Sequence, residues 1–225
     1  MLTAASEVSN GITPFQPDWV IPLHAGKAGH AIFVFPASHS DPALSQEAVI
    51  ARAAGGASPV WGLAFSAALR DLARQAGAAA VGAEYVAQIR AIQPHGPYLL
   101  FGNCLGGYLA WETARQLLAT GETTVRLLFH EVPLRRDFTR VRTGPLPINA
   151  PNVFRLGHYY APSALPIHLT HQMTPSWASA GWWRPWQQVA LLGMETVLLP
   201  EGSDLPHAER MGEAIRDWSS TVDPA

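Results

Sequence analysis

An apolar segment that runs through a glycine-bounded turn into a helix constrains this chain more than any other feature. Residues 98–101, Tyr-Leu-Leu-Phe, predict a buried strand, and residues 102–107, Gly-Asn-Cys-Leu-Gly-Gly, predict a tight turn. Residues 108–119 then predict a helix that closes at Gly121. A strand followed so closely by a helix is typical of an α/β protein, and the side chain at the tip of the turn is held outward above the sheet.

The rest of the chain repeats this alternation of strand and helix. Further strands are predicted at residues 20–23, 31–35, 59–63, 125–129, 167–171 and 196–199. Further helices are predicted at residues 43–54, at 67–92 with a break near Gly77 or Gly82, and at 206–219. This order predicts a mostly parallel central sheet with helices on both faces.

The predicted domain covers residues 19–225, because 225 residues suit one domain with a sizeable core. Residues 1–18 are polar and mixed, which favours a flexible lead-in or linker. Residues 134–158 show no clear period and many prolines and arginines, so we expect a short insertion there, in the position of a lid.

Composition excludes several classes of protein. The apolar fraction is 48%, the charged fraction 14% and the formal net charge −2, which gives no reason to expect a nucleic-acid partner. The chain has one cysteine, so it has no internal disulfide and no zinc site built on several thiolates, and we expect no metal. No apolar run approaches the ~20 residues of a spanning helix, and the first residues do not resemble a signal peptide, so we expect no membrane association and a cytoplasmic location.

Cys104 occupies the tip of the glycine-bounded turn, where α/β-hydrolases hold a nucleophile. Gly102 and Gly106 leave room for the sharp backbone, and the helix that starts beside Leu105 points its amides at the thiol. We therefore expect a lowered thiol pKa and a place where an oxyanion can be bound. The alternative is that Cys104 is a small buried hydrophobe in an ordinary strand-to-helix turn.

The chain resembles the thioesterase domains of modular polyketide and nonribosomal peptide synthetases, and thus the α/β-hydrolase fold. Four segments carry the resemblance: residues 21–37 with the opening strand, 59–63 with the next strand, 85–98 before the turn, and 109–117 after it. The resemblance covers nearly the whole of residues 19–218 and is most specific in its middle third.

This family implies a catalytic triad and an oxyanion hole. Its acid follows the strand after the turn, which in this chain is Glu131 where the family usually has aspartate. The alternative for Glu131 is a solvated carboxylate at the end of a strand. The family's histidine lies in a Gly-x-His loop after the last strand, but here the loop is shortened and His207 stands at the start of the final helix. Either His207 swings back to act as the base, or the triad lacks its histidine and His207 is a surface residue. The oxyanion hole would use the backbone amides of Ala37 and Leu105.

Other residues are candidates for contact with the substrate. His171 is a possible substitute base or accessory donor, and His39 is either a substrate contact or a solvated loop residue. His130 is predicted to point away from Glu131 and to be structural, because neighbours on a regular strand face opposite sides. An aromatic group either lines the acyl channel or packs in the core; its members are Tyr159, Tyr160, Trp177, Trp182, Trp183 and Trp186. Among these, Tyr160 and Trp182 are the predicted substrate contacts.

The resemblance implies acyl transfer from a carrier protein, whose phosphopantetheine thiol presents the substrate, and no further cofactor. A cysteine nucleophile makes the bound acyl group a thioester, which favours release by cyclisation or aminolysis. Two alternatives remain: an editing thioesterase that hydrolyses stalled acyl chains, and a non-catalytic module that only docks a carrier protein.

Overall fold

The computed structural model describes residues 17–35, 46–137, 160–202 and 205–221. The predicted lead-in at residues 1–18 and insertion at residues 134–158 therefore lie largely outside the described residues. Within those residues, seven strands form one sheet in the order β1-β3-β2-β4-β5-β6-β7. Every neighbouring pair is parallel except β1 and β3, as the strand and helix alternation predicts.

The strands of the sheet are β1 (Val20–His24), β2 (Ile32–Phe35), β3 (Val60–Leu63), β4 (Tyr98–Asn103), β5 (Val125–His130), β6 (Leu169–Met173) and β7 (Met194–Leu198). Each strand overlaps its predicted segment, although β6 begins two residues later and β7 two residues earlier than predicted. All of β2 and β4 is buried, because central strands of a parallel sheet are covered on both faces.

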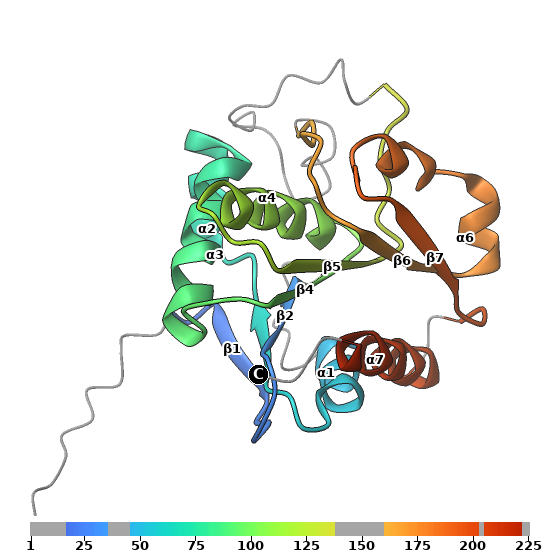
Figure 1. The fold of residues 1–225 in the computed structure, drawn as a ribbon, viewed down its shortest axis with the longest axis horizontal. Helices are drawn as coiled ribbons and strands as arrows, with labels where there is room; N and C mark the ends of the chain where they lie inside the picture. Colours follow the sequence, from blue (N-terminus) through green and yellow to red (C-terminus); the bar gives the residue numbers. More distant parts are fainter. Residues whose placement is uncertain (1–16, 36–45, 138–159, 203–204, 222–225) are drawn as a thin grey trace, which may run out of the picture.

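Helices cover both faces of the sheet (Figure 1). One face carries α2 (Ala67–Ala76), α3 (Ala78–Ile92) and α4 (Gly106–Ala119), and the other carries α1 (Gln46–Gly55) and α7 (Leu205–Ser220), which pack on each other. The helix predicted over residues 67–92 is divided at Gly77, whose φ of 83° a glycine adopts without strain. The tryptophan-rich segment forms α6 (Pro175–Ala180) and the short 3-10 helix η4 (Arg184–Gln188).

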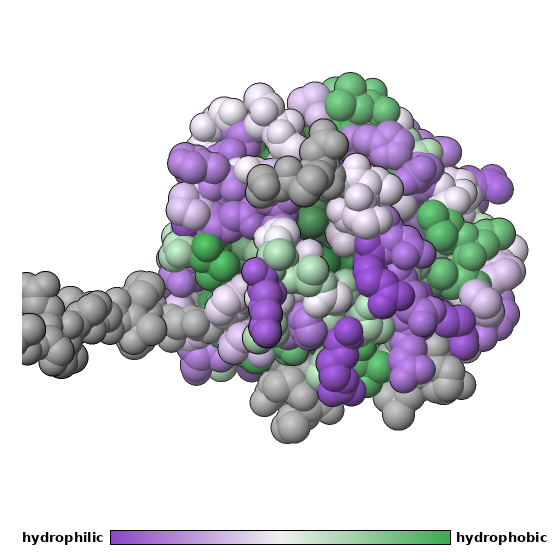
Figure 2. All heavy atoms as spheres, turned by 60° about the horizontal axis from the view of Figure 1, so that its bottom comes forward, coloured by the Kyte–Doolittle hydropathy of each residue, from purple (hydrophilic) through white to green (hydrophobic). Residues whose placement is uncertain are grey.

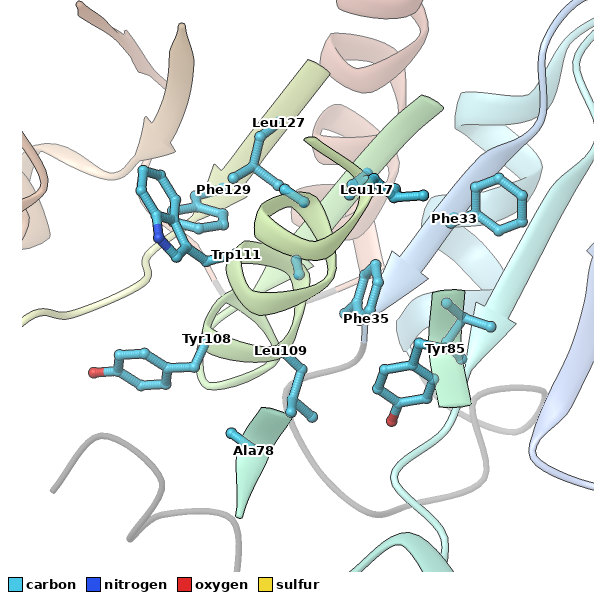
Figure 3. Packing of buried hydrophobic residues seen from close by; sticks show 14 of the residues in the cluster. Phe33, Phe35, Ala78, Tyr85, Tyr108, Leu109, Trp111, Leu117, Leu127 and Phe129 are labelled. Carbon is cyan, nitrogen blue, oxygen red and sulfur yellow. The ribbon is translucent and has the colours of Figure 1, made fainter. Parts of the chain in front are cut away.

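Two apolar cores lie on the two faces of the sheet. In the larger, Trp111 of α4 lies beside Phe129 of β5, with 6.3 Å between ring centroids, and Phe35 packs against Tyr85 (Figure 3). The smaller core joins β2, β4 and β5 to α1 and α7, and includes Ile50, Phe101 and Ile215. These two cores fix the carboxyl end of β4, where Cys104 follows.

In the described part of the chain, four large apolar side chains are exposed. They are Trp182, Leu191, Leu192 and Leu198. The face shown in Figure 2, on the side of α1 and α7, mixes hydrophilic residues with separate hydrophobic clusters. Among the described residues, no helix has the length and apolarity needed to cross a bilayer.

Candidate active site

Cys104 stands between β4 and α4 in a left-handed backbone conformation. Its φ is 48°, which is rare for a residue with a side chain and is held here by the surrounding structure. Its backbone amide donates a hydrogen bond to the His130 carbonyl oxygen, at 2.8 Å. The end of β5 therefore holds the tip of the turn in place.

Two glycines allow the backbone to turn so sharply. A Cβ on Gly102 would lie 2.5 Å from the Cα of Gly107. A Cβ on Gly107 would in turn lie 2.4 Å from Cγ2 of Val132. Because real Cβ atoms do not approach so closely, strand β4, helix α4 and the segment after β5 can meet only if both positions lack a side chain.

The Cys104 thiol is half-buried and has two polar neighbours. Burial raises its pKa, a hydrogen bond from the Leu105 backbone amide lowers it, and the negative charge of Glu131 raises it. The net pKa is raised, so the expectation of a thiol made acidic by the helix is wrong. One amide does not offset the loss of solvent together with a neighbouring carboxylate.

Glu131 follows the last residue of β5 and is held at both its backbone and its side chain. Its φ is 49°, and its amide donates to the carbonyl oxygen of Gln172 in β6, at 3.1 Å. Its Oε1 accepts hydrogen bonds from the backbone amide and the hydroxyl of Thr174, at 3.1 and 2.6 Å. The carboxylate is thereby fixed close enough for its charge to act on Cys104.

His130 is the imidazole that lies beside this carboxylate, which the sequence did not predict. Its Nε2 is 3.9 Å from Glu131 Oε2, and burial lowers the pKa of His130 to about 4. Strand alternation separates neighbours only while the strand continues, and at Glu131 the backbone has already turned. One feature of the sequence indicated this contact. His130 is the last residue of β5, and β5 pairs with β4, the strand that leads into Cys104.

His207 lies in the first turn of α7 and only 3% of its surface is exposed, so the interpretation as a surface residue is wrong. Its ring packs against that of His130, with 5.4 Å between centroids. His207 is thus linked to the turn through His130, which lies beside Glu131.

His171 lies inside the protein rather than on the rim of the site. It is fully buried between the rings of Phe129 and Trp177, and burial lowers its pKa to about 3. Its Nε2 accepts a hydrogen bond from the Val132 amide, at 3.1 Å. Val132 in turn packs on Gly107, so His171 supports the turn by holding Val132 in place.

The remaining predicted site residues are scattered. Tyr160 is buried and its hydroxyl donates to Glu112, at 3.0 Å, so it packs in the core instead of lining a channel. Trp182 is 57% exposed and its carbonyl oxygen accepts from the Leu134 amide. Ala37 and His39 lie outside the described residues. No group of three metal-binding side chains occurs in the described part of the chain.

The sheet order and the sharp turn between β4 and α4 are those of the α/β-hydrolase fold, and Cys104 stands at the tip of this turn. Residues 57–135, which include this turn, match the thioesterase domain family. The resemblance to thioesterase domains of polyketide and nonribosomal peptide synthetases is thereby confirmed.

Similar proteins come from these assembly lines. Residues of this chain are 57% identical over 54 positions to "Non-reducing polyketide synthase crz7" of Cladonia metacorallifera, which is 24% of this chain and 3% of that protein. They are 30% identical over 118 positions to "Polyketide synthase PksR" of Bacillus subtilis, which is 52% of this chain and 4% of that protein. The matched region is thus a small part of much longer relatives.

A similar solved structure is the NocB thioesterase domain in covalent complex with a fluorophosphonate nocardicin G analog. Its TM-score is 0.66 at 21% identity, over 88% of this chain and 98% of that one. At 21% identity this likeness shows the fold alone, and the same fold can carry different reactions.

Proposed function

We propose that this protein accepts an acyl group from the phosphopantetheine thioester of a carrier protein onto Cys104 and then releases it. The observation that carries the proposal is the position of the thiol at the tip of the turn, bonded to the Leu105 amide and within the field of Glu131. A buried, inert cysteine would need neither the strained backbone nor a carboxylate beside it.

Glu131 is the proposed base for the first step. Its carboxylate takes the thiol proton as Sγ attacks the thioester carbonyl, and a bond forms between Sγ and that carbon. The Leu105 amide, with Ala37 as the second donor implied by the family, stabilises the oxyanion. The carbonyl reforms, the bond to the phosphopantetheine sulfur breaks, and that sulfur leaves as a thiol with the proton from Glu131.

In this proposal, His130 and His207 support the Glu131 carboxylate. A neutral thiol with a raised pKa needs a base, and Glu131 is the carboxylate whose charge acts on this thiol. His130 contacts the carboxylate, and His207 packs behind His130. In this proposal Glu131 acts on the sulfur, and His130 and His207 support the carboxylate, which reverses the usual order of acid and histidine in this fold.

Release by cyclisation or aminolysis is the proposed second step. The acyl group on Cys104 is a thioester, which amines and carbon nucleophiles attack more readily than water does. An intramolecular nucleophile on the acyl chain gives a lactam or another ring, while Glu131 removes its proton and Cys104 regains its thiol. Hydrolysis is the second candidate, because the carboxylate is partly exposed and can activate water equally well.

The test is the product formed from a carrier protein loaded with an acyl chain that bears an amine. Mass spectrometry of a wild-type reaction is expected to show the cyclic product, and Cys104→Ala is expected to show none. Free acid alone would contradict cyclisation and leave the hydrolytic enzyme. Neither product, together with retained carrier binding, would identify the docking module and contradict the proposed function.

A further inference from the structure

Two arginines, one after β5 and one after α6, have no acidic partner among the described residues. Arg136 and Arg184 are both exposed, and no carboxylate among the described residues lies within ion-pair distance of either. The neighbouring Arg135 differs, because its guanidinium binds Asp137 at 3.0 Å. Arg136 and Arg184 therefore present uncompensated positive charge to solvent.

These two arginines line one hollow. It has a volume of about 440 Å³, and the other described residues that line it are Pro185, Gln187 and Gln188. Guanidinium groups and amide side chains both offer N–H donors, and two guanidinium groups add charge. A concave site with two arginines and two glutamines suits a phosphate better than a neutral or cationic group.

Two hydrogen bonds hold together the two segments that line the hollow. The Leu134 amide donates to the Trp182 carbonyl oxygen, at 2.9 Å, and Trp186 Nε1 donates to the Val132 carbonyl oxygen, also at 2.9 Å. These bonds join the segment after β5, which carries Arg136, to the segment that carries Arg184. The Arg184 guanidinium also lies over the Trp183 ring, 5.9 Å from its centroid.

The hollow and Cys104 lie along the same piece of chain. Arg136 is five residues beyond Glu131, so their Cα atoms are at most about 18 Å apart. Tyr108, in the first turn of α4, donates its hydroxyl proton to the Pro133 carbonyl oxygen, which ties this segment to the helix after Cys104. A ligand that spans the hollow and the thiol must be elongated, with an anion at one end.

We infer that Arg136 and Arg184 bind the phosphate of the phosphopantetheine arm while its thioester reaches Cys104. The inference rests on the proposed function, since that function supplies a substrate with a phosphate at one end and a thioester at the other. Carboxylates on the carrier protein's surface offer related chemistry. The hollow favours the phosphate, because a compact group with several acceptor oxygens can meet both arginines at once.

The test compares two small thioesters, acyl-pantetheine and acyl-phosphopantetheine, which differ only in the phosphate. For the double variant Arg136→Gln/Arg184→Gln, we expect the KM for acylation by acyl-phosphopantetheine to rise about tenfold or more. The KM for acyl-pantetheine should not change. The matched control is Arg135→Gln, which removes an adjacent exposed arginine outside the hollow and should alter neither KM.

Three results would overturn the inference. An equal rise with both thioesters would mean that the arginines act through the fold. No change with either thioester, but weaker acylation by the loaded carrier protein, would assign them to carboxylates of the carrier. Equal Kd values for phosphopantetheine and pantetheine on the Cys104→Ala protein, measured by calorimetry, would exclude a phosphate site. That titration needs no catalysis, so it tests the site even if neither thioester acylates the wild type and the proposed function fails.

Discussion

The Glu131 carboxylate accepts two hydrogen bonds from one residue, Thr174, through its backbone amide at 3.1 Å and its hydroxyl at 2.6 Å. This pairing fixes a carboxylate from the end of β5 against the residue that follows β6. It leaves Oε2 directed to His130. The proposed base is therefore held by the neighbouring strand rather than by its own rotamer preference.

Thr174→Val tests this support. The variant loses the hydroxyl bond but keeps the amide bond, so we expect acylation of Cys104 to slow about fivefold, the equivalent of ~1 kcal/mol. Single-turnover acylation rates measure the effect. Thr170→Val is the control, because it loses a similar bond to Glu195 elsewhere on β6 and should keep the wild-type rate. Equal slowing in both variants would mean that Thr174 matters only to the fold.

Glu131→Gln should change the thiol's acidity and its acylation in opposite directions. The negative charge of Glu131 contributes to the raised pKa of the Cys104 thiol, so its removal lowers that pKa. Alkylation by iodoacetamide at pH 8 should then become faster than in the wild type. Acyl transfer should become slower, because the proposed base is lost. A variant that is slower in both reactions would show that the substitution merely closes access to the sulfur.

Gly102→Ala should destabilise the turn between β4 and α4. The new Cβ would lie 2.5 Å from the Gly107 Cα and 3.1 Å from the Phe129 ring, and neither backbone nor core can easily move away. We expect a loss of about 2–3 kcal/mol in the free energy of unfolding, measured by urea denaturation, and loss of acylation. Gly82→Ala is the comparison, since its Cβ would meet only the side chains of Gln116 and Glu112 and no backbone of a neighbouring element. A larger loss in Gly82→Ala than in Gly102→Ala would contradict this account of the turn.

Much of this arrangement could be predicted from the sequence, because it depends on local pattern. The apolar runs fixed the strands and the turn at Cys104, and the break at Gly77 divided the long helix as predicted. The burial of Tyr160 against Glu112 could not be predicted, because the partners are far apart in the chain. The contact of His130 with Glu131 depends on a positive φ that breaks strand alternation. The raised pKa of Cys104 depends on burial, which a motif does not reveal.

Two buried histidines should make the fold sensitive to acid. Burial lowers the pKa of His130 to about 4 and of His171 to about 3, whereas histidine in an unfolded chain titrates near pH 6.5. The unfolded chain thus binds more protons below about pH 6.5. The stability contributed by the neutral rings is complete above that pH and is lost progressively as the pH falls from about 6.5 to about 4 for His130 and to about 3 for His171.

Urea denaturation between pH 7 and pH 4 measures this loss. In His171→Gln, the new side chain can still accept the Val132 amide, and the slope of stability against pH should fall by up to about 1.4 kcal/mol per pH unit. His95→Gln, which replaces an exposed histidine, should keep the wild-type slope. An unchanged slope in His171→Gln would mean that His171 is not kept neutral by the fold.

The most direct measurement is the intact mass of the protein after brief incubation with an acyl-pantetheine thioester. We expect a mass increase of one acyl group, located at Cys104 by peptide mapping and absent in Cys104→Ala. An unmodified wild-type protein, or an acyl group that persists in Cys104→Ala, would contradict the central claim that this sulfur receives the substrate.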